Sequence, residues 1–381
     1  MQRSSGRTCT REPAHVNPDR SIAVIGPVLI IGTGLIGTSI ALSLRRAGVE
    51  VLLEDLDPEQ AQVAAGMGAG DIAGPESEPA LVVVAVPPRH AAQVLARASD
   101  DFPLATITDV TSVKERVLAE ACALGADSGR LVGGHPMAGR EVSGASSARP
   151  DLLDDRLWII TPTDATQAQH QRAAHQLATT CGAYPVEMSA AEHDRAVALV
   201  SHAPQLLSSV LAAQLVDADA TYVQVAGQGL RDMTRIAGSE SALWTDILGV
   251  NAAPVADVLD GVIYDLQRAA RALRAVAAGE LASIDVVTEE LHRGVIGRGR
   301  IPGKHGASPS AYTEVAVMLA DRPGELGRLF TAVGETTVNL EDVRIEHVLG
   351  RQSGLVELSV QPDAVTTLEA ALRSRGFDVR G

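Results

Sequence analysis

Aromatic residues and cysteine are scarce in this chain of 381 residues. Two Trp, four Tyr and three Phe make up 2% of it, so we expect Ala and Val to do most of the core packing. Cys9, Cys122 and Cys181 are odd in number, widely spaced and without a metal-ligand pattern. This usage of cysteine is typical of a reducing compartment, so we expect a cytoplasmic protein that has no metal site.

Basic runs are missing as well. The net charge is −15, and no extended basic segment is present to neutralise phosphates, which argues against a nucleic-acid or membrane-surface partner. Ser21–Leu44 is uncharged and long enough for a membrane anchor, but one proline and four glycines interrupt it. A strand, a tight turn and a helix account for these residues better than a spanning helix does. We expect residues 1–20 to form a disordered tail.

Residues 21–188 alternate short β-rich apolar runs with helical stretches. This alternation is typical of a doubly wound sheet and predicts a Rossmann-type α/β domain. The expected strands are Val28–Ile31, Glu50–Glu54, Leu81–Ala85, Thr106–Asp109, Leu131–Gly133, Leu157–Thr161 and Tyr184–Glu187.

The pattern changes after residue 188. Residues 189–296 carry Ala, Leu, Val and charged residues at helical spacing, which predicts an all-α domain. Leu206–Leu215 is apolar on all sides, so we expect this domain to pack against a second subunit in a homodimer. Residues 297–311 are predicted to be a Gly-rich linker. Residues 312–381 follow the order βαββαβ, which predicts a ferredoxin-like α+β domain.

A glycine-rich motif follows the first expected strand and opens a helix at Thr38–Arg46, which is the setting of a dinucleotide site. It consists of Gly32, Thr33, Gly34, Leu35, Ile36 and Gly37. The glycines permit a tight turn and close approach of a pyrophosphate, and the helix N-terminus offers N–H groups to it. Asp55 would bind the ribose hydroxyls and disfavour a 2′-phosphate, which predicts NAD rather than NADP. Val86 and Pro87 end the third strand, where the cofactor should pass.

Two polar clusters follow later strands of the same domain. Thr108–Lys114 comes after one strand, and Gly133–Glu141 comes after the next. In open α/β sheets, ligands bind at the edge where such strands end. His135, in the second cluster, is therefore placed to reach a substrate, although a histidine that merely stabilises the loop would fit the same pattern.

These two clusters, with the glycine motif before them and Arg231–Arg235 after them, resemble the prephenate and arogenate dehydrogenases of tyrosine biosynthesis. Four separated motifs match that family in order, from about Val28 to Phe377. The resemblance implies NAD-dependent oxidative decarboxylation of prephenate to 4-hydroxyphenylpyruvate, or of arogenate to tyrosine. It implies that His135 takes the proton of the ring hydroxyl and that Ser112 holds this hydroxyl or the imidazole.

The resemblance also implies a set of substrate-binding residues. We expect Arg235 to bind a substrate carboxylate and Asp232 to orient the Arg235 side chain. The alternative is that Asp232 and Arg235 form an ordinary surface ion pair. Pro204 should kink its helix and turn polar neighbours towards a cleft. Gln205 stands where the family often has a histidine, so prephenate and arogenate both stay open. The remaining expected contacts are Arg140, Glu141, Ser201, His202 and Trp244, of which His202 and Trp244 could equally be core residues.

Asp321–Gly327 and Val338–His347 resemble an ACT domain, a module that commonly binds amino acids. We therefore expect an aromatic amino acid as an effector, although a role in assembly alone is the alternative. Hydroxyacid dehydrogenases and imine reductases join similar domains but often use a lysine in the helical domain, and this chain has no lysine between Lys114 and Lys304. The non-enzymatic alternative is a regulator that senses NAD and an amino acid without chemistry.

Overall fold

A computed structural model describes residues 26–139, 144–301, 312–347 and 353–380. Its contacts divide the chain into two compact units. One unit comprises residues 26–218 and 233–258, and the other comprises residues 219–232 and 259–380. We describe each unit by itself.

The first unit contains an eight-stranded sheet in the order β3-β2-β1-β4-β5-β6-β7-β8. Its strands are β1 (Val28–Ile31), β2 (Val51–Glu54), β3 (Asp71–Ile72), β4 (Leu81–Val84), β5 (Thr106–Asp109), β6 (Leu131–Pro136), β7 (Leu157–Thr161) and β8 (Tyr184–Glu187). Neighbouring strands pair in parallel except β6 and β7, which are antiparallel. The first six strands have the order of a Rossmann sheet, which confirms the predicted α/β fold. The short edge strand β3 was not predicted.

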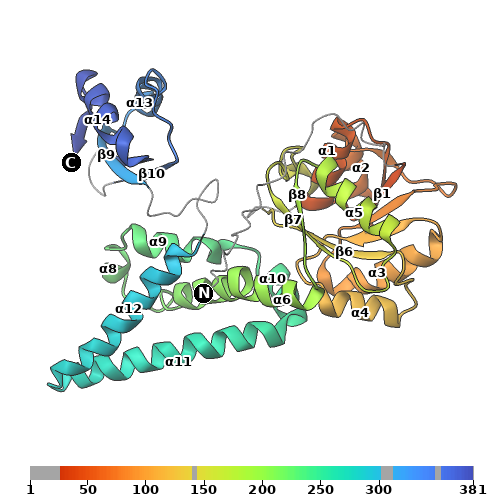
Figure 1. Cartoon of the computed structure of the whole chain (residues 1–381), viewed down its shortest axis with the longest axis horizontal. Coiled ribbons are helices and arrows are strands. Elements are labelled where there is room, and N and C mark those ends of the chain that lie inside the picture. The colour runs from red at the N-terminus through yellow and green to blue at the C-terminus, as the bar shows by residue number, and fades with distance from the viewer. Residues whose placement is uncertain (1–25, 140–143, 302–311, 348–352, 381) are drawn as a thin grey trace, which may run out of the picture. The chain divides into compact units, whose positions relative to one another are not determined.

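Helices cover both faces of this sheet, as Figure 1 shows. They are α1 (Leu35–Arg46), α2 (Pro58–Gly66), α3 (Pro88–Asp101), α4 (Glu115–Ala123) and α5 (Ala168–Thr180), with a short 3₁₀ turn at Ala145–Ser147. Ile40, Leu44 and Leu177 bury the apolar sides of α1 and α5 in one core. Leu95 and Val117 do the same for α3 and α4 in the core on the other face. Strand β1 and helix α1 occupy most of the uncharged stretch Ser21–Leu44, so no spanning helix forms there.

The rest of the first unit is helical. Helix α6 (Ala190–Val197) continues through a π-helical turn, η2 (Ala198–His202), into α7 (Ala203–Ala213). The widened turn ends two residues before Pro204, where the sequence predicts a kink. The continuous stretch Ala190–Ala213 is long and apolar enough to cross a membrane, but it also carries the buried polar residues His193, Asp194 and His202. The unit closes with the 3₁₀ helix η3 (Arg235–Gly238), α10 (Ser241–Val250) and the start of α11 (Ala252–Ala277).

The second unit has a helical part and a small sheet. Its helices are α8 (Ala220–Val223), most of α9 (Gln228–Thr234) and α11, η4 (Leu281–Ser283) and α12 (Ile284–Gly299). Helix α12 includes residues 297–299, so the first three residues of the predicted linker are helical.

The sheet strands are β9 (Thr313–Ala320), β10 (Asp342–His347), β11 (Ser353–Val360) and β12 (Asp378–Arg380). They form an antiparallel sheet in the order β10-β11-β9-β12, with α13 (Glu325–Gly334), η7 (Pro362–Ala364) and α14 (Val365–Ser374) in the chain between them. The apolar sides of α13 and α14 bury Leu329 and Leu368 in the same core as the sheet residue Val317. This topology confirms the predicted ferredoxin-like fold. Strand β10 begins at Asp342, four residues into the segment Val338–His347 that resembles an ACT domain.

Candidate active site

The three glycines of the motif after β1 have different surroundings. Gly32 has φ +100°, and a Cβ there would lie 2.5 Å from the carbonyl oxygen of Ala85. A Cβ on Gly37 would lie 1.9 Å from the carbonyl oxygen of Gly32, so only glycine lets α1 start this close to β1. A Cβ on Gly34 would meet nothing within 4 Å. The first and third glycines are therefore required by the fold, whereas the second borders open space that a ligand can enter.

The start of α1 fits the phosphates of a dinucleotide. Helix α1 begins at Leu35, three residues before the predicted Thr38, and Gly34 is its N-cap residue. No side chain caps the helix, and its first turn holds no acidic residue, so its free N–H groups and the positive end of its dipole face the open space at Gly34. This arrangement can bind a pyrophosphate.

The Asp55 carboxylate lies directly after β2 and beside the glycine motif. It accepts hydrogen bonds from the main-chain N–H of Thr33 at 2.6 Å and from the Thr33 hydroxyl at 2.9 Å. Asp57 N donates to the other oxygen at 2.9 Å. A carboxylate has about four lone-pair sites, so Asp55 can still accept from a ribose hydroxyl. The neighbouring Glu54 instead forms an ion pair with Arg97.

The other predicted cofactor contacts lie around the same turn. Thr33 is buried, and Leu35 and Ile36 are half-buried in the first turn of α1. Val86 is half-buried and Pro87 is exposed, directly after β4. Because β1 and β4 are parallel neighbours, these residues and the glycine motif share one edge of the sheet.

The loop from β5 to α4 is held by buried charges. Lys114 and Asp109 are both fully buried and form an ion pair. Burial lowers the pKa of the Lys114 ammonium from its usual 10.5, against the opposing effect of Asp109. Thr111 donates its main-chain N–H to the same Asp109 carboxylate at 3.0 Å. Ser112 is half-buried in this rigid loop.

Three side chains form a hydrogen-bonded row that starts at His135 on β6. His135 Nδ1 lies 2.8 Å from His193 Nε2, and His193 Nδ1 lies 2.7 Å from Asp194 Oδ1. The Asp194 carboxylate also accepts from the main-chain N–H groups of Lys114 at 2.8 Å and Glu115 at 2.9 Å, and so caps the start of α4. The row therefore ties the sheet edge to helix α6.

A second connection runs from Asp194 to His202. Asn251, which is buried between α10 and α11, places its Nδ2 2.9 Å from the Asp194 carbonyl oxygen and 3.0 Å from His202 Nδ1. The half-buried ring of Trp244 lies edge-on to His202, with the ring centroids 6.1 Å apart. His202 and Trp244 thus belong to the same cluster as His135.

His135 and His202 both stay neutral at neutral pH. Burial lowers the pKa of His135 well below 6.5, and the neighbouring His193, Lys114 and His202 lower it further. Burial also lowers the pKa of His202 to about 4, although Asp194 opposes this effect. A neutral imidazole can accept a proton at one nitrogen and donate a hydrogen bond at the other.

The remaining predicted contacts have varied positions. Gln205 is buried, and its Nε2 donates to the carbonyl oxygen of Ile236 at 2.9 Å. Ser201 is half-buried in η2. Arg235 begins η3 and is exposed, and Asp232 accepts a hydrogen bond from Gln228 at 2.7 Å. Arg140 and Glu141 lie outside the described residues.

The sequence analysis did not include His193, Asp194 or Asn251 among the site residues. The signal in the sequence was weak, because a histidine and an aspartate near the start of a helix are usually a cap or a solvated face. What distinguishes them is burial: His193 is 0% and Asp194 2% exposed. Among the residues that the structure describes, no group of three or more His, Cys, Asp or Glu side chains could hold a metal ion.

Sequence comparisons match two consecutive segments of the chain to known domain families. Residues 40–188 match the family described as prephenate dehydrogenase, nucleotide-binding domain. Residues 189–284 match the family described as prephenate dehydrogenase, dimerization domain.

Similar proteins extend this match to nearly the whole chain. The chain is 39% identical over 352 residues to "Probable prephenate dehydrogenase NovF" of Streptomyces niveus, and the alignment covers 91% of this chain and 97% of that one. It is 30% identical over 350 residues to the prephenate dehydrogenase of Bacillus subtilis, with 88% and 92% covered. The solved prephenate dehydrogenase of Aquifex aeolicus, in complex with hydroxyphenyl propionate and NAD+, aligns with a TM-score of 0.64 at 28% identity over 73% of this chain and all of that one. The chain therefore belongs to the prephenate dehydrogenase family.

Proposed function

We propose that this protein is an NAD-dependent prephenate dehydrogenase that forms 4-hydroxyphenylpyruvate and carbon dioxide for tyrosine biosynthesis in the cytoplasm. The observation that carries the proposal is the row from His135 to Asp194, because it gives a neutral imidazole at the edge where the nucleotide motif also lies. The family match and the uncapped start of α1 support the same reaction.

His135 acts as the general base. Since its pKa lies well below 6.5, the imidazole is unprotonated at neutral pH and can take the proton of the ring hydroxyl. NAD+, when bound, accepts the hydride from the ring carbon that bears this hydroxyl. The ring carboxylate leaves as carbon dioxide, and its bonding electrons complete the aromatic ring as a phenolate. The protonated His135 then returns its proton to the phenolate oxygen. Ser112, in the rigid β5–α4 loop, orients the hydroxyl or the imidazole.

The glycine motif would hold the cofactor. The N–H groups at the start of α1 would bind the pyrophosphate beside Gly34, and Asp55 would accept hydrogen bonds from the adenosine ribose. The negative charge of Asp55 disfavours a 2′-phosphate, so NAD is used in preference to NADP. Val86 and Pro87 line the path of the cofactor across the sheet edge.

The helical part of the protein binds the substrate. Arg235 binds a carboxylate through its planar guanidinium, and Asp232 is expected to assist it. His202, Ser201 and Trp244 complete the pocket, with Arg140 and Glu141 as further expected contacts. Gln205 is an uncharged residue beside this pocket, so arogenate, which carries an ammonium group, stays as the second candidate substrate.

Following NADH absorbance with prephenate and then with arogenate tests the proposal. We expect NADH formation with NAD+ and prephenate. A higher kcat/KM for arogenate would make the protein an arogenate dehydrogenase. Absence of NADH with both substrates would favour a non-catalytic regulator that binds NAD.

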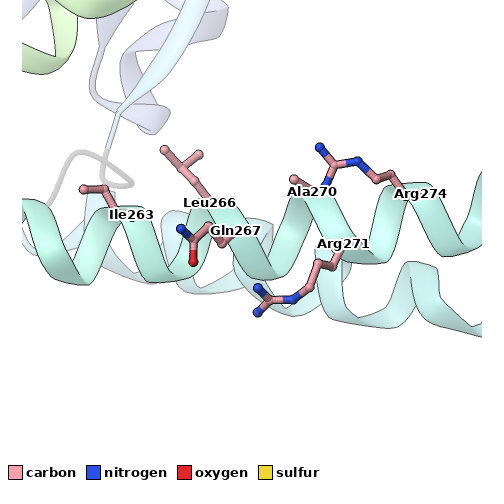
Figure 2. Close-up of a pocket in the computed structure, with 6 residues that line it drawn as sticks. All are labelled: Ile263, Leu266, Gln267, Ala270, Arg271 and Arg274. Atoms are coloured by element: carbon pink, nitrogen blue, oxygen red, sulfur yellow. The ribbon is translucent and has the colours of Figure 1, made fainter.

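We also propose that the protein is a homodimer. Helix α11 has a shallow groove with an estimated volume of about 350 Å³. The groove is lined by Ile263, Leu266, Gln267, Ala270, Arg271 and Arg274 (Figure 2). Ile263 is 48% and Leu266 60% exposed, and exposed apolar side chains that lie together on one helix can mark a surface that packs against a partner. Light scattering should give twice the chain mass, and a monomer at micromolar concentration would contradict the assignment.

We further propose that the C-terminal domain binds an aromatic amino acid as an effector. Gly324, with φ +93°, leads the chain from β9 into α13, and no side chain caps that helix. Its free N–H groups offer a site for a carboxylate. Calorimetry of the full chain with tyrosine, phenylalanine and tryptophan tests this, and absence of binding heat with all three would refute it.

A further inference from the structure

We propose that Asp194 fixes the two histidines of the site in opposite tautomers, so that His135 presents an unprotonated Nε2 and His202 presents a protonated one. The proposal makes Asp194, His193 and Asn251 positioning residues. The tautomers follow from hydrogen bonds within the protein and from a neutral His193, and only the substrate groups that they meet rest on the proposed function.

The first branch starts at the Asp194 carboxylate. It accepts from the main-chain N–H groups of Lys114 and Glu115, which stabilise the ionised form. An ionised carboxylate can only accept, so His193 Nδ1, 2.7 Å away, carries a proton and donates it. The proposal takes His193 as a neutral imidazole, so its Nε2 has a lone pair and accepts from His135 Nδ1, which lies 2.8 Å away. His135 therefore carries its proton on Nδ1, which leaves Nε2 free to act as a base.

The second branch starts at the Asp194 main-chain carbonyl. A carbonyl oxygen can only accept, so the side-chain atom of Asn251 that lies 2.9 Å from it is the donating Nδ2. The same Nδ2 lies 3.0 Å from His202 Nδ1. Because an amide NH₂ cannot accept, His202 Nδ1 must have a lone pair. His202 is neutral at neutral pH, so its single proton is on Nε2.

Opposite tautomers give the two rings different tasks. Among the described residues, the Nε2 atoms of His135 and His202 have no hydrogen-bond partner, so neither is engaged by the protein itself. Nε2 of His135 can accept the proton of an alcohol, whereas Nε2 of His202 can donate a hydrogen bond to an oxygen anion. Asp194 on α6 thus acts through two separate groups. Its carboxylate makes His135 a proton acceptor, and its main-chain carbonyl oxygen makes His202 a hydrogen-bond donor.

The direct test is nitrogen NMR of the full chain labelled with ¹⁵N-histidine, without ligands, at neutral pH. Spectra of His135→Asn and His202→Gln assign the two rings by the signals that disappear. We expect Nδ1 protonated and Nε2 unprotonated in His135, and the reverse in His202. The same tautomer in both rings, or an imidazolium at His193, would overturn the proposal.

Variants of the positioning residues test the consequences. His193→Phe removes the acceptor for His135 Nδ1, and we expect kcat to fall about 10- to 100-fold while the KM for prephenate changes little. His193→Gln should restore most of the loss, because a glutamine can accept from His135 and donate to Asp194. Equal losses in both variants would show that only the packing of His193 matters, which would overturn its assigned role.

Asn251→Asp replaces the donor that faces His202 with an acceptor. We expect its ¹⁵N spectrum to show the His202 proton moved to Nδ1, and the KM to rise roughly tenfold with a smaller change in kcat. An unchanged His202 spectrum would overturn the second branch.

His170→Gln is the matched control, because His170 is also buried and bonded through Nδ1, to the Thr106 hydroxyl at 2.7 Å, but lies outside the cluster. Its kinetic constants should equal those of the unaltered protein. If NADH never forms but both tautomers are as assigned, the proposed function fails and this inference stands. If NADH forms and the tautomers differ, the inference alone fails.

Discussion

The glycine motif and the histidine cluster, the two halves of the proposed site, are built in different ways. The motif from Gly32 to Gly37 is contiguous, and its shape follows from backbone that only glycine tolerates. The histidine cluster combines residues from β6, α6, η2 and the end of α10, up to about 116 positions apart in sequence between His135 and Asn251. A local site and a long-range site should therefore respond differently to substitution: the first through the fold, and the second through the chemistry.

The largest expected effect is on the chemistry of the histidine cluster. His135→Asn keeps a polar side chain of similar size but removes the base, so we expect kcat to fall about 10²- to 10⁴-fold. The Kd for NAD+ should change little, because the glycine motif is the proposed cofactor site. Steady-state kinetics and calorimetry measure the two quantities. Unchanged turnover would refute the role of His135, and loss of NAD+ binding would mean that the two halves of the site are not separable.

The second effect is the pH dependence of stability that His202 causes. In the unfolded chain a histidine binds a proton near pH 6.5, but in the fold the pKa of His202 is about 4. The unfolded state therefore takes up more protons between these values, so stability present above pH 6.5 is lost as the pH falls towards 4. The shift corresponds to a loss of up to roughly 3 kcal/mol.

Urea unfolding at a series of pH values measures this loss. His202→Gln should flatten the slope between pH 6.5 and 4 relative to the unaltered protein. The exposed His292 provides the control, because His292→Gln should leave the slope unchanged. Equal slopes for all three proteins would contradict the burial of a neutral His202.

The contrast between the two halves also explains how far the sequence could predict the structure. Strands Val28–Ile31, Thr106–Asp109 and Leu157–Thr161 were predicted to the residue, because short runs rich in β-branched residues mark buried strands. The exposed two-residue strand Asp71–Ile72 carries no such signal. The pairing of His135 with His193 could not be predicted, since it depends on how α6 packs against the sheet edge and not on any local pattern.

The third prediction separates two glycines of the motif. Gly37→Ala places a Cβ 1.9 Å from the carbonyl oxygen of Gly32, so α1 must shift, and we expect a loss of stability of about 1–3 kcal/mol. Gly34→Ala meets no neighbour within 4 Å and should unfold at nearly the same temperature, but its methyl group occupies the space next to the pyrophosphate. Its Kd for NAD+ should rise roughly tenfold, which is about 1.4 kcal/mol. If Gly34→Ala were the less stable variant, the assigned roles of the two glycines would be wrong.

The smallest effect concerns the choice between the two acidic residues at the end of β2. Asp55→Asn keeps the size of the side chain and one acceptor for Thr33, but removes the charge that repels a 2′-phosphate. We expect the ratio of kcat/KM for NAD+ to that for NADP+ to fall several-fold, with little change in kcat. Glu54→Gln is the control, because Glu54 is already paired with Arg97 and its loss should leave the ratio unchanged. The opposite pattern, with a response only to Glu54→Gln, would assign the ribose to Glu54. The Asp55 carboxylate would then serve only to hold Thr33 in the turn, and the proposed orientation of the cofactor in the glycine motif would be wrong.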